Sequence, residues 1–260
     1  MSRLAEAPIQ PLDLILFRGV DPVSSAICFV EERRLGRGDF SHAGLAITRD
    51  ALDLPFLEPG KVYVWESTLS APAGFWARFT DKVPDVETAG VRFGVQIRDL
   101  ELVVPGYSSN GGRVAWCAFH GDRPPIEAMR PRLRALYEEF GHAPYNRNLL
   151  ALFSVVFPAL RPASGHFARA EDRVAHFVND VLHRAREHKS VADAEHHMFC
   201  SEWVGTVYKR LGLSTPQFDP HVAAPVTPLL RPKMFAEPVI LDPGEDAFEP
   251  APRPEQGSGR

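Results

Sequence analysis

Cys200 begins a stretch with the pattern of an amphipathic helix, FCSEWVGTVYKRLGL at residues 199–213. Every fourth residue from 199 to 211 is apolar, and Gly212 is a typical C-terminal stop. A thiol is a weak nucleophile at neutral pH unless its pKa is lowered, and the positive end of a helix favours the thiolate. The position therefore predicts a nucleophilic cysteine. The alternative is a small buried apolar residue, the commonest fate of a free cysteine.

His42 is the candidate base for this thiol, because cysteine catalysis needs a group that takes the thiol proton. The chain has ten histidines, but His42 stands in SHAGLAIT, which alternates like a strand. The alternation puts His42, Gly44 and Ala46 on one face, and these small neighbours leave room for another group to approach. A histidine satisfied by a backbone carbonyl inside the sheet is the alternative.

Glu66 is the candidate group that orients the base. It interrupts the apolar face of the next predicted strand, KVYVWEST at residues 61–68. If the two strands form a hairpin whose turn is centred near Leu54, Glu66 lies directly opposite His42, with Cβ atoms about 5 Å apart. The sequence therefore predicts a Cys200–His42–Glu66 set, although Glu66 could also be a surface carboxylate.

A zinc site is a second interpretation of the same cysteine. In HHMFC, His196 and Cys200 are four residues apart and on a helix could both ligate zinc, with His197 or another residue completing the site. No second ligand pair at metal spacing accompanies them in the sequence. We therefore favour thiol chemistry, which requires no metal or organic cofactor.

The elements that must position these residues change type along the chain. Five short runs rich in β-branched and aromatic residues predict strands at residues 12–17, 41–48, 61–68, 90–97 and 113–119. Helical patterns are found at residues 22–35, 126–141 and 171–189. An α+β fold follows, with one domain over residues 1–242 and a disordered, proline-rich tail over residues 243–260.

Composition restricts the partners and the compartment. A net charge of −4 over 260 residues gives no broad basic surface, so we expect no nucleic-acid partner. Three cysteines without CxxC spacing predict free thiols, with Cys28 and Cys117 in the core. No signal peptide is readable, and the longest apolar stretch, residues 149–160, is shorter than the roughly 20 residues of a membrane span. We expect a cytoplasmic protein with no transmembrane segment.

Several motifs together resemble the circularly permuted papain-like hydrolases. These form a branch of the NlpC-type cysteine peptidase superfamily in which His precedes Cys, and they are related to lecithin:retinol acyltransferase-like enzymes. The motifs, over residues 12–230, are LDLILF, SHAGLAI, VYVWEST, GHAPYN, FCSEWVGTVYKRLGL and VTPLLRP. The resemblance implies a permuted papain-like fold, in which an antiparallel and partly barrel-like sheet packs against a helical half.

The same resemblance implies roles for particular residues. It assigns Cys200 as nucleophile, His42 as base and Glu66 as the orienting residue, and Tyr145 in APYN resembles a tyrosine that assists at the oxyanion. The family's usual Gly-Asp before the first strand is Leu12–Asp13 here, a departure that concerns the turn leading into that strand.

The expected activity is cysteine-dependent hydrolysis or acyl transfer on an amide or ester, through a thioester. The alternative is a non-catalytic binding module that keeps a papain-like cleft. We expect a small amide, peptide or acyl-lipid substrate. Because the apolar residues 149–160 could line a hydrophobic acceptor site, lipid-like substrates are favoured over cell-wall peptides, and peripheral contact with a membrane is compatible with the sequence.

Overall fold

One antiparallel sheet organises the protein. The computed structural model describes residues 3–20, 22–36, 38–68, 82–91, 94–144, 200–214 and 234–241. Within them, six strands are arranged in the order β4-β3-β2-β1-β5-β6, with β4 and β6 at the two edges. The strands are β1 (Leu14–Arg18), β2 (His42–Thr48), β3 (Val62–Thr68), β4 (Gly94–Asp99), β5 (Arg113–Cys117) and β6 (Val239–Leu241). The α+β class and the antiparallel sheet are confirmed.

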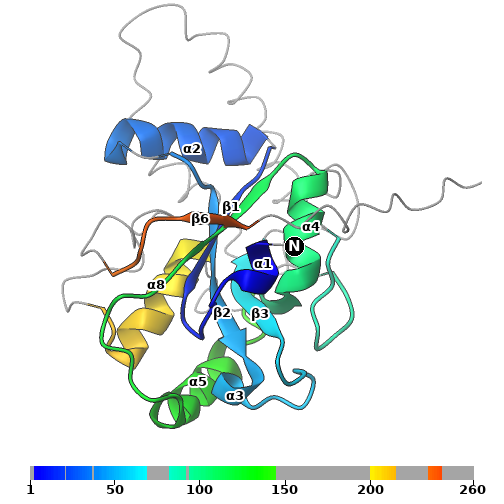
Figure 1. The fold of residues 1–260 in the computed structure, drawn as a ribbon, viewed down its shortest axis with the longest axis vertical. Coiled ribbons are helices and arrows are strands. Elements are labelled where there is room, and N and C mark those ends of the chain that lie inside the picture. Colours follow the sequence, from blue (N-terminus) through cyan, green and yellow to red (C-terminus); the bar gives the residue numbers. More distant parts are fainter. Residues whose placement is uncertain are drawn as a thin grey trace, which may run out of the picture.

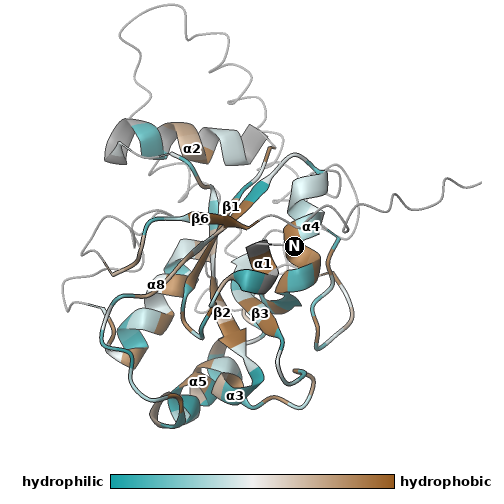
Figure 2. Ribbon diagram, viewed as in Figure 1, coloured by the Kyte–Doolittle hydropathy of each residue, from teal (hydrophilic) through white to brown (hydrophobic). Residues whose placement is uncertain are grey.

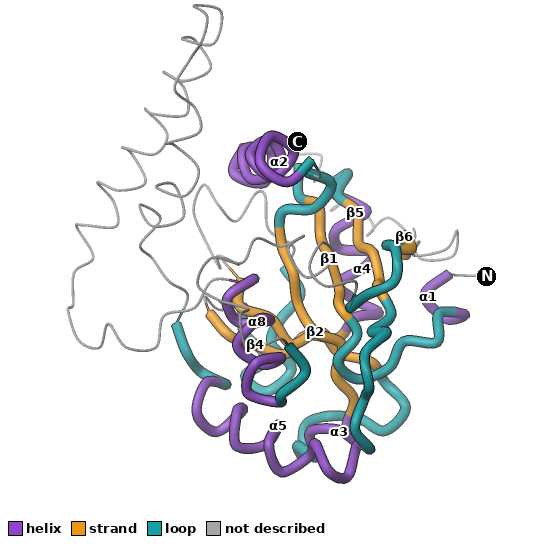
Figure 3. Tube along the Cα trace, turned by 90° about the vertical axis from the view of Figure 1, so that its left-hand side faces the viewer, coloured by secondary structure: helices purple, strands orange, loops and turns teal. Residues whose placement is uncertain are grey.

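Helices surround this sheet (Figure 1). They are α1 (Arg3–Glu6), α2 (Pro22–Leu35), α3 (Arg49–Leu52), α4 (Leu100–Ser109), α5 (Ile126–Phe140) and α8 (Cys200–Leu211). α2 connects the end of β1 to the start of β2 and lies beyond that end of the sheet (Figures 1 and 3). Hydrophobic residues concentrate in the central strands, whereas the helices also carry hydrophilic residues (Figure 2).

Both faces of the sheet are buried. Because successive side chains of each strand point to opposite faces, each face contributes to its own core. Leu45 and Trp65 belong to the core that packs against α5 and α8, and the ring centroids of Trp65 and Trp203 are 4.7 Å apart. Ala46 and Val64 belong to the second core, which includes the apolar residues of α4. α8 therefore packs against the face that contains Leu45 and Trp65. The other face contains Ala46, Val64 and the residues of β2 and β3 that point the same way.

The helix that begins with Cys200 ends as its sequence predicts. Gly212 has a φ of 75°, and its N–H donates to the carbonyl of Lys209. The N–H of Leu213 donates to the carbonyl of Tyr208, which completes a Schellman motif. The apolar stripe of α8, Trp203, Val204, Val207, Tyr208 and Leu211, is buried throughout.

The turn before β1 forms without the glycine that the family pattern has there. Leu12 adopts a φ of 70° and its side chain is fully buried. The hydroxyl of Tyr208 donates to the carbonyl of Leu12 at 2.5 Å, and the carboxylate of Asp13 accepts from the Trp116 indole at 2.7 Å and from the backbone N–H of Phe119 at 3.0 Å. Burial and these bonds hold a conformation that is unusual for leucine.

Four described elements lack a counterpart in the sequence prediction, namely α1, α3, α4 and β6. α4 follows β4 directly and is capped by Asp99, whose carboxylate accepts from the N–H of Glu101, but it contains Pro105, which weakens its helical signal. β6 is only three residues long. The predicted helix at residues 171–189, the apolar stretch 149–160 and the predicted tail 243–260 lie outside the described residues. In the part of the chain that is described, no helix has the length and apolar character to cross a membrane.

Candidate active site

The register between β2 and β3 differs from the predicted one. Gly44, not His42, is the partner of Glu66. The predicted hairpin was centred near Leu54, but the connection contains the helical turn α3, so counting residues does not give its centre. The slip is two residues, and because side chains alternate with a period of two, His42 and Glu66 still lie on one face as diagonal neighbours.

Gly44 makes the diagonal contact between His42 and Glu66 sterically feasible. A Cβ at position 44 would lie 2.6 Å from Cγ2 of Val64 and 3.0 Å from Cβ of Glu66. With no side chain there, the carboxylate of Glu66 reaches the ring of His42, and Oε2 and Nε2 are 2.5 Å apart. The side chain of Glu66 is fully buried, whereas 13% of the His42 side chain is exposed. The His42 ring is thus fixed from the protein side and reachable from outside.

Arg98 holds the other oxygen of Glu66. Its Nε donates to Oε1 of Glu66 at 2.5 Å, and both side chains are fully buried. Arg98 lies on β4 and pairs with Val64, so it shares the face of Glu66. Arg98 was not among the predicted site residues, because the predicted strand ended at Ile97 and the role of Arg98 depends on the pairing of β3 with β4.

Cys200 is the first residue of α8 and its thiol meets the ring of His42. The contact combines a side-chain hydrogen bond with a charge interaction, and the backbone N–H groups of Ala43 and Ser201 also donate to the sulfur. Since Nε2 of His42 is held by Glu66, the ring nitrogen left for the thiol is Nδ1. The structure therefore brings together the three residues Cys200, His42 and Glu66, from α8, β2 and β3.

The electrostatics of this cluster favour charged forms. Burial opposes a charge on His42, but the sulfur of Cys200 and then the carboxylate of Glu66 raise its pKa from 6.5 to about 10. Burial likewise raises the pKa of the Cys200 thiol, but His42 and the two backbone N–H groups more than offset it, so this pKa is lowered. Burial also opposes ionisation of Glu66, yet Arg98 and His42 keep its pKa below the usual range. A thiolate–imidazolium pair is the expected resting state.

The other residues singled out in the sequence are Tyr145, the histidines of the alternative zinc site and the two core cysteines. Tyr145, His196 and His197 lie outside the described residues, so neither the tyrosine nor the zinc site can be placed. Within the described residues, no group of three His, Cys, Asp or Glu side chains is arranged to hold a metal ion. Cys28 and Cys117 form no disulfide and are buried, as predicted for core thiols.

Comparisons of the sequence with protein-family models and with curated proteins found no match. The candidate site therefore rests on the residues and their geometry.

Proposed function

We propose that this protein is a cysteine-dependent hydrolase or acyltransferase that acts on an amide or ester bond. The observation that supports the proposal is the contact between the Cys200 thiol and an imidazole whose far nitrogen is 2.5 Å from a buried carboxylate. A base held between a thiol and an orienting carboxylate is the arrangement that nucleophilic cysteine catalysis requires.

In the proposed reaction, the Cys200 thiolate attacks the substrate carbonyl and a tetrahedral oxyanion forms. The backbone N–H of Cys200, at the start of α8, and the side chain of Tyr145 are the proposed donors to this oxyanion. His42 Nδ1 then donates its proton to the leaving group, and the carbon–leaving group bond breaks to give a thioester. Water or another acceptor, deprotonated by His42, attacks the thioester and releases the thiolate.

Glu66 and Arg98 act on this reaction through His42. The ionised carboxylate accepts a hydrogen bond from Nε2–H of His42, which directs Nδ1 to the sulfur and stabilises the imidazolium. The guanidinium of Arg98 keeps Glu66 ionised in a buried position. Arg98 is thus a positioning residue, separated from the reacting sulfur by Glu66 and His42.

The proposal includes a permuted papain-like fold, in which the histidine strand precedes the cysteine helix in the chain, and a cytoplasmic location. It also retains acyl-lipid or amphiphilic amide substrates, a preference that depends on residues 149–160. Phe153→Asp is expected to reduce turnover of a long-chain ester relative to a short-chain ester. If both esters are affected equally, the apolar stretch does not select the acyl chain.

Selective alkylation at pH 6 tests the proposed nucleophile. Iodoacetamide should label Cys200 well before Cys28 and Cys117, because an ordinary thiol is almost wholly protonated at this pH. Cys28 is the matched internal control, since its exposure of 6% is close to the 7% of Cys200, whereas Cys117 is fully buried. The label is mapped by mass spectrometry in wild type and in His42→Ala, in which labelling of Cys200 should slow sharply.

Turnover of a chromogenic acyl ester, measured beside Cys200→Ala, tests the reaction itself. Activity that disappears in Cys200→Ala supports the proposal. Equal labelling of the three cysteines in the folded protein, with no Cys200-dependent turnover, would contradict it and favour the non-catalytic binding module.

A further inference from the structure

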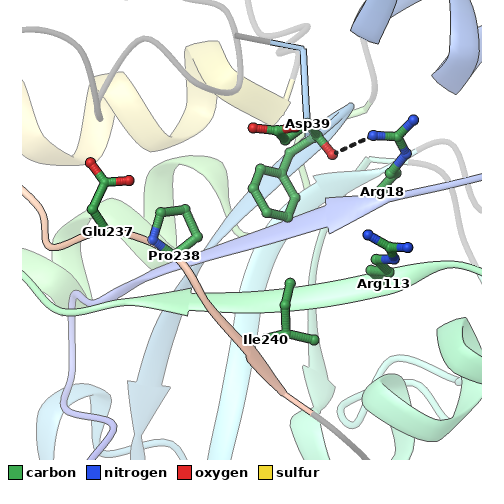
Figure 4. A pocket seen from close by; sticks show the side chains of 7 residues that line it. Arg18, Asp39, Arg113, Glu237, Pro238 and Ile240 are labelled. Atoms are coloured by element: carbon green, nitrogen blue, oxygen red, sulfur yellow. Dashed lines mark hydrogen bonds between the residues drawn. The ribbon is translucent and has the colours of Figure 1, made fainter.

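A pocket of about 230 Å³ lies at the end of the sheet where β1 ends and β2 begins, and its described lining does not include Cys200, His42 or Glu66. Its lining combines charged and apolar side chains, which are Arg18, Asp39, Phe40, Arg113, Glu237, Pro238 and Ile240 (Figure 4). Figure 4 shows Arg18 and Arg113 on one side and Glu237 on the other, with Pro238 and Ile240 between them and Asp39 next to Arg18.

The two arginines of this pocket are direct cross-strand partners. Arg18 ends β1, Arg113 begins β5, and their Cα atoms are paired in the ladder. Like charges placed directly opposite each other destabilise a sheet unless an opposite charge lies close by. Within the described residues, Arg18 donates to the backbone carbonyl of Asp39 at 3.5 Å, and neither guanidinium is ion-paired with a carboxylate. Each guanidinium presents paired N–H donors that suit a carboxylate or a phosphate, and two of them line this side of the pocket.

The pocket is close in the strands to His42, the proposed base. Phe17 is the partner of His42, so Arg18 is one position beyond the base, and Asp39 and Phe40 precede His42 by three and two residues. Because a residue spans at most about 3.6 Å, Phe40 and Asp39 are within roughly 7 and 11 Å of His42 along the backbone. Because side chains alternate along β1, Arg18 is on the opposite face from Phe17. That face packs against α8, the helix that supplies Cys200.

We propose that the Arg18–Arg113 side of this pocket binds an anionic group, a carboxylate or a phosphate, of the substrate whose carbonyl Cys200 attacks. This inference rests on the proposed function and specifies its substrate class as acidic acyl compounds. Phe40, Pro238 and Ile240 contact the chain between the anion and the carbonyl.

Equilibrium binding tests the pocket without catalysis. Octanedioate and inorganic phosphate are titrated by calorimetry into wild type, Arg18→Gln, Arg113→Gln and the control Arg134→Gln, an exposed arginine of α5 that does not line the pocket. Wild type and the control should bind at least one anion, and each pocket variant should bind it about 10- to 100-fold more weakly, as expected for loss of a charged hydrogen bond. The tighter anion identifies the substrate group. Absence of binding of both anions to wild type, or equal binding by the pocket variants, would overturn the inference.

A pair of matched esters links the pocket to the reaction. Mono-p-nitrophenyl octanedioate ends in a carboxylate, and p-nitrophenyl octanoate has the same chain length without the charge. Arg113→Gln should raise KM for the charged ester about 10- to 100-fold and leave KM for the neutral ester and Cys200 alkylation at pH 6 unchanged. If the pocket variants bind the anion more weakly than wild type but neither ester shows Cys200-dependent turnover, only the proposed function is refuted. Turnover of both esters with no effect of Arg113→Gln refutes the substrate inference alone.

Discussion

At the residue scale, the candidate site is a row of alternating charges. The guanidinium of Arg98, the carboxylate of Glu66, the imidazolium of His42 and the thiolate of Cys200 follow one another, and each contacts the next. A buried charge is costly unless it is paired, so each group depends on its neighbours to remain ionised. The lowered pKa of Cys200 is therefore a property of the whole row.

Glu66→Gln should separate the stabilising role of the row from its chemical role. The substitution leaves the charge of Arg98 buried without its carboxylate partner, which should reduce the free energy of unfolding by about 3–5 kcal/mol. It also removes the negative charge that raises the pKa of His42, so alkylation of Cys200 at pH 6 should slow about tenfold for each unit by which the thiol pKa rises. Urea denaturation and alkylation kinetics measure the two effects.

The double variant Glu66→Gln/Arg98→Met is the matched control. It removes the unpaired cation, so most of the lost stability should return while the slow alkylation remains. If the double variant is no more stable than Glu66→Gln alone, the pairing of Arg98 with Glu66 does not account for the loss.

The direction of each pKa shift predicts the shape of the pH profile. Below its pKa of about 10, His42 carries the proton that an amide leaving group needs, and this proton is lost as pH rises through that value. Turnover of a p-nitroanilide should therefore fall above about pH 10, whereas alkylation, which needs only the thiolate, should not. In Glu66→Gln the alkaline limb should move to lower pH. If turnover and alkylation fall together at high pH, loss of the His42 proton is not the cause.

At the element scale, the register of β2 and β3 places Gly44 opposite Glu66, and the missing side chain at position 44 lets Glu66 reach His42. Gly44→Ala adds a Cβ 2.6 Å from the Val64 side chain, which should cost about 1–3 kcal/mol of stability and push Glu66 away from His42. Alkylation of Cys200 at pH 6 should slow as a result. Gly90→Ala is the control, because its nearest neighbour atom would lie 3.8 Å away. Equal reactivity of the two variants would show that Glu66 reaches His42 without the space at position 44.

Local patterns predicted the elements, but they did not predict the distances between them. Alternation identified the strands and the common face of His42 and Glu66, and the helical stripe identified α8 with its stop at Gly212. The register was wrong by two residues because it depends on the geometry of the connection, in which α3 forms. Arg98 was missed because its role depends on the pairing of β3 with β4, which no pattern within one strand records.

At the scale of the whole molecule, the site requires docking between segments distant in sequence. Cys200 comes from α8, which packs on one face of the sheet. His42, Glu66 and Arg98 come from three neighbouring strands and point to the other face. They meet at His42, the first residue of β2. Activation of the thiol is therefore a consequence of tertiary structure and cannot arise in α8 alone.

This dependence predicts that thiol activation and folding are lost together. In the unfolded chain every cysteine should have an ordinary pKa, so at pH 6 less than about 1% of each is thiolate. The preference of iodoacetamide for Cys200 should therefore disappear in urea with the same midpoint as the change in tryptophan fluorescence, because Trp203 of α8 contacts Trp65 of β3. Pulse alkylation across the urea series gives the first midpoint and fluorescence gives the second. A preference that is lost at lower urea, while fluorescence still reports native packing, would mean that the start of α8 detaches from His42 before the sheet unfolds.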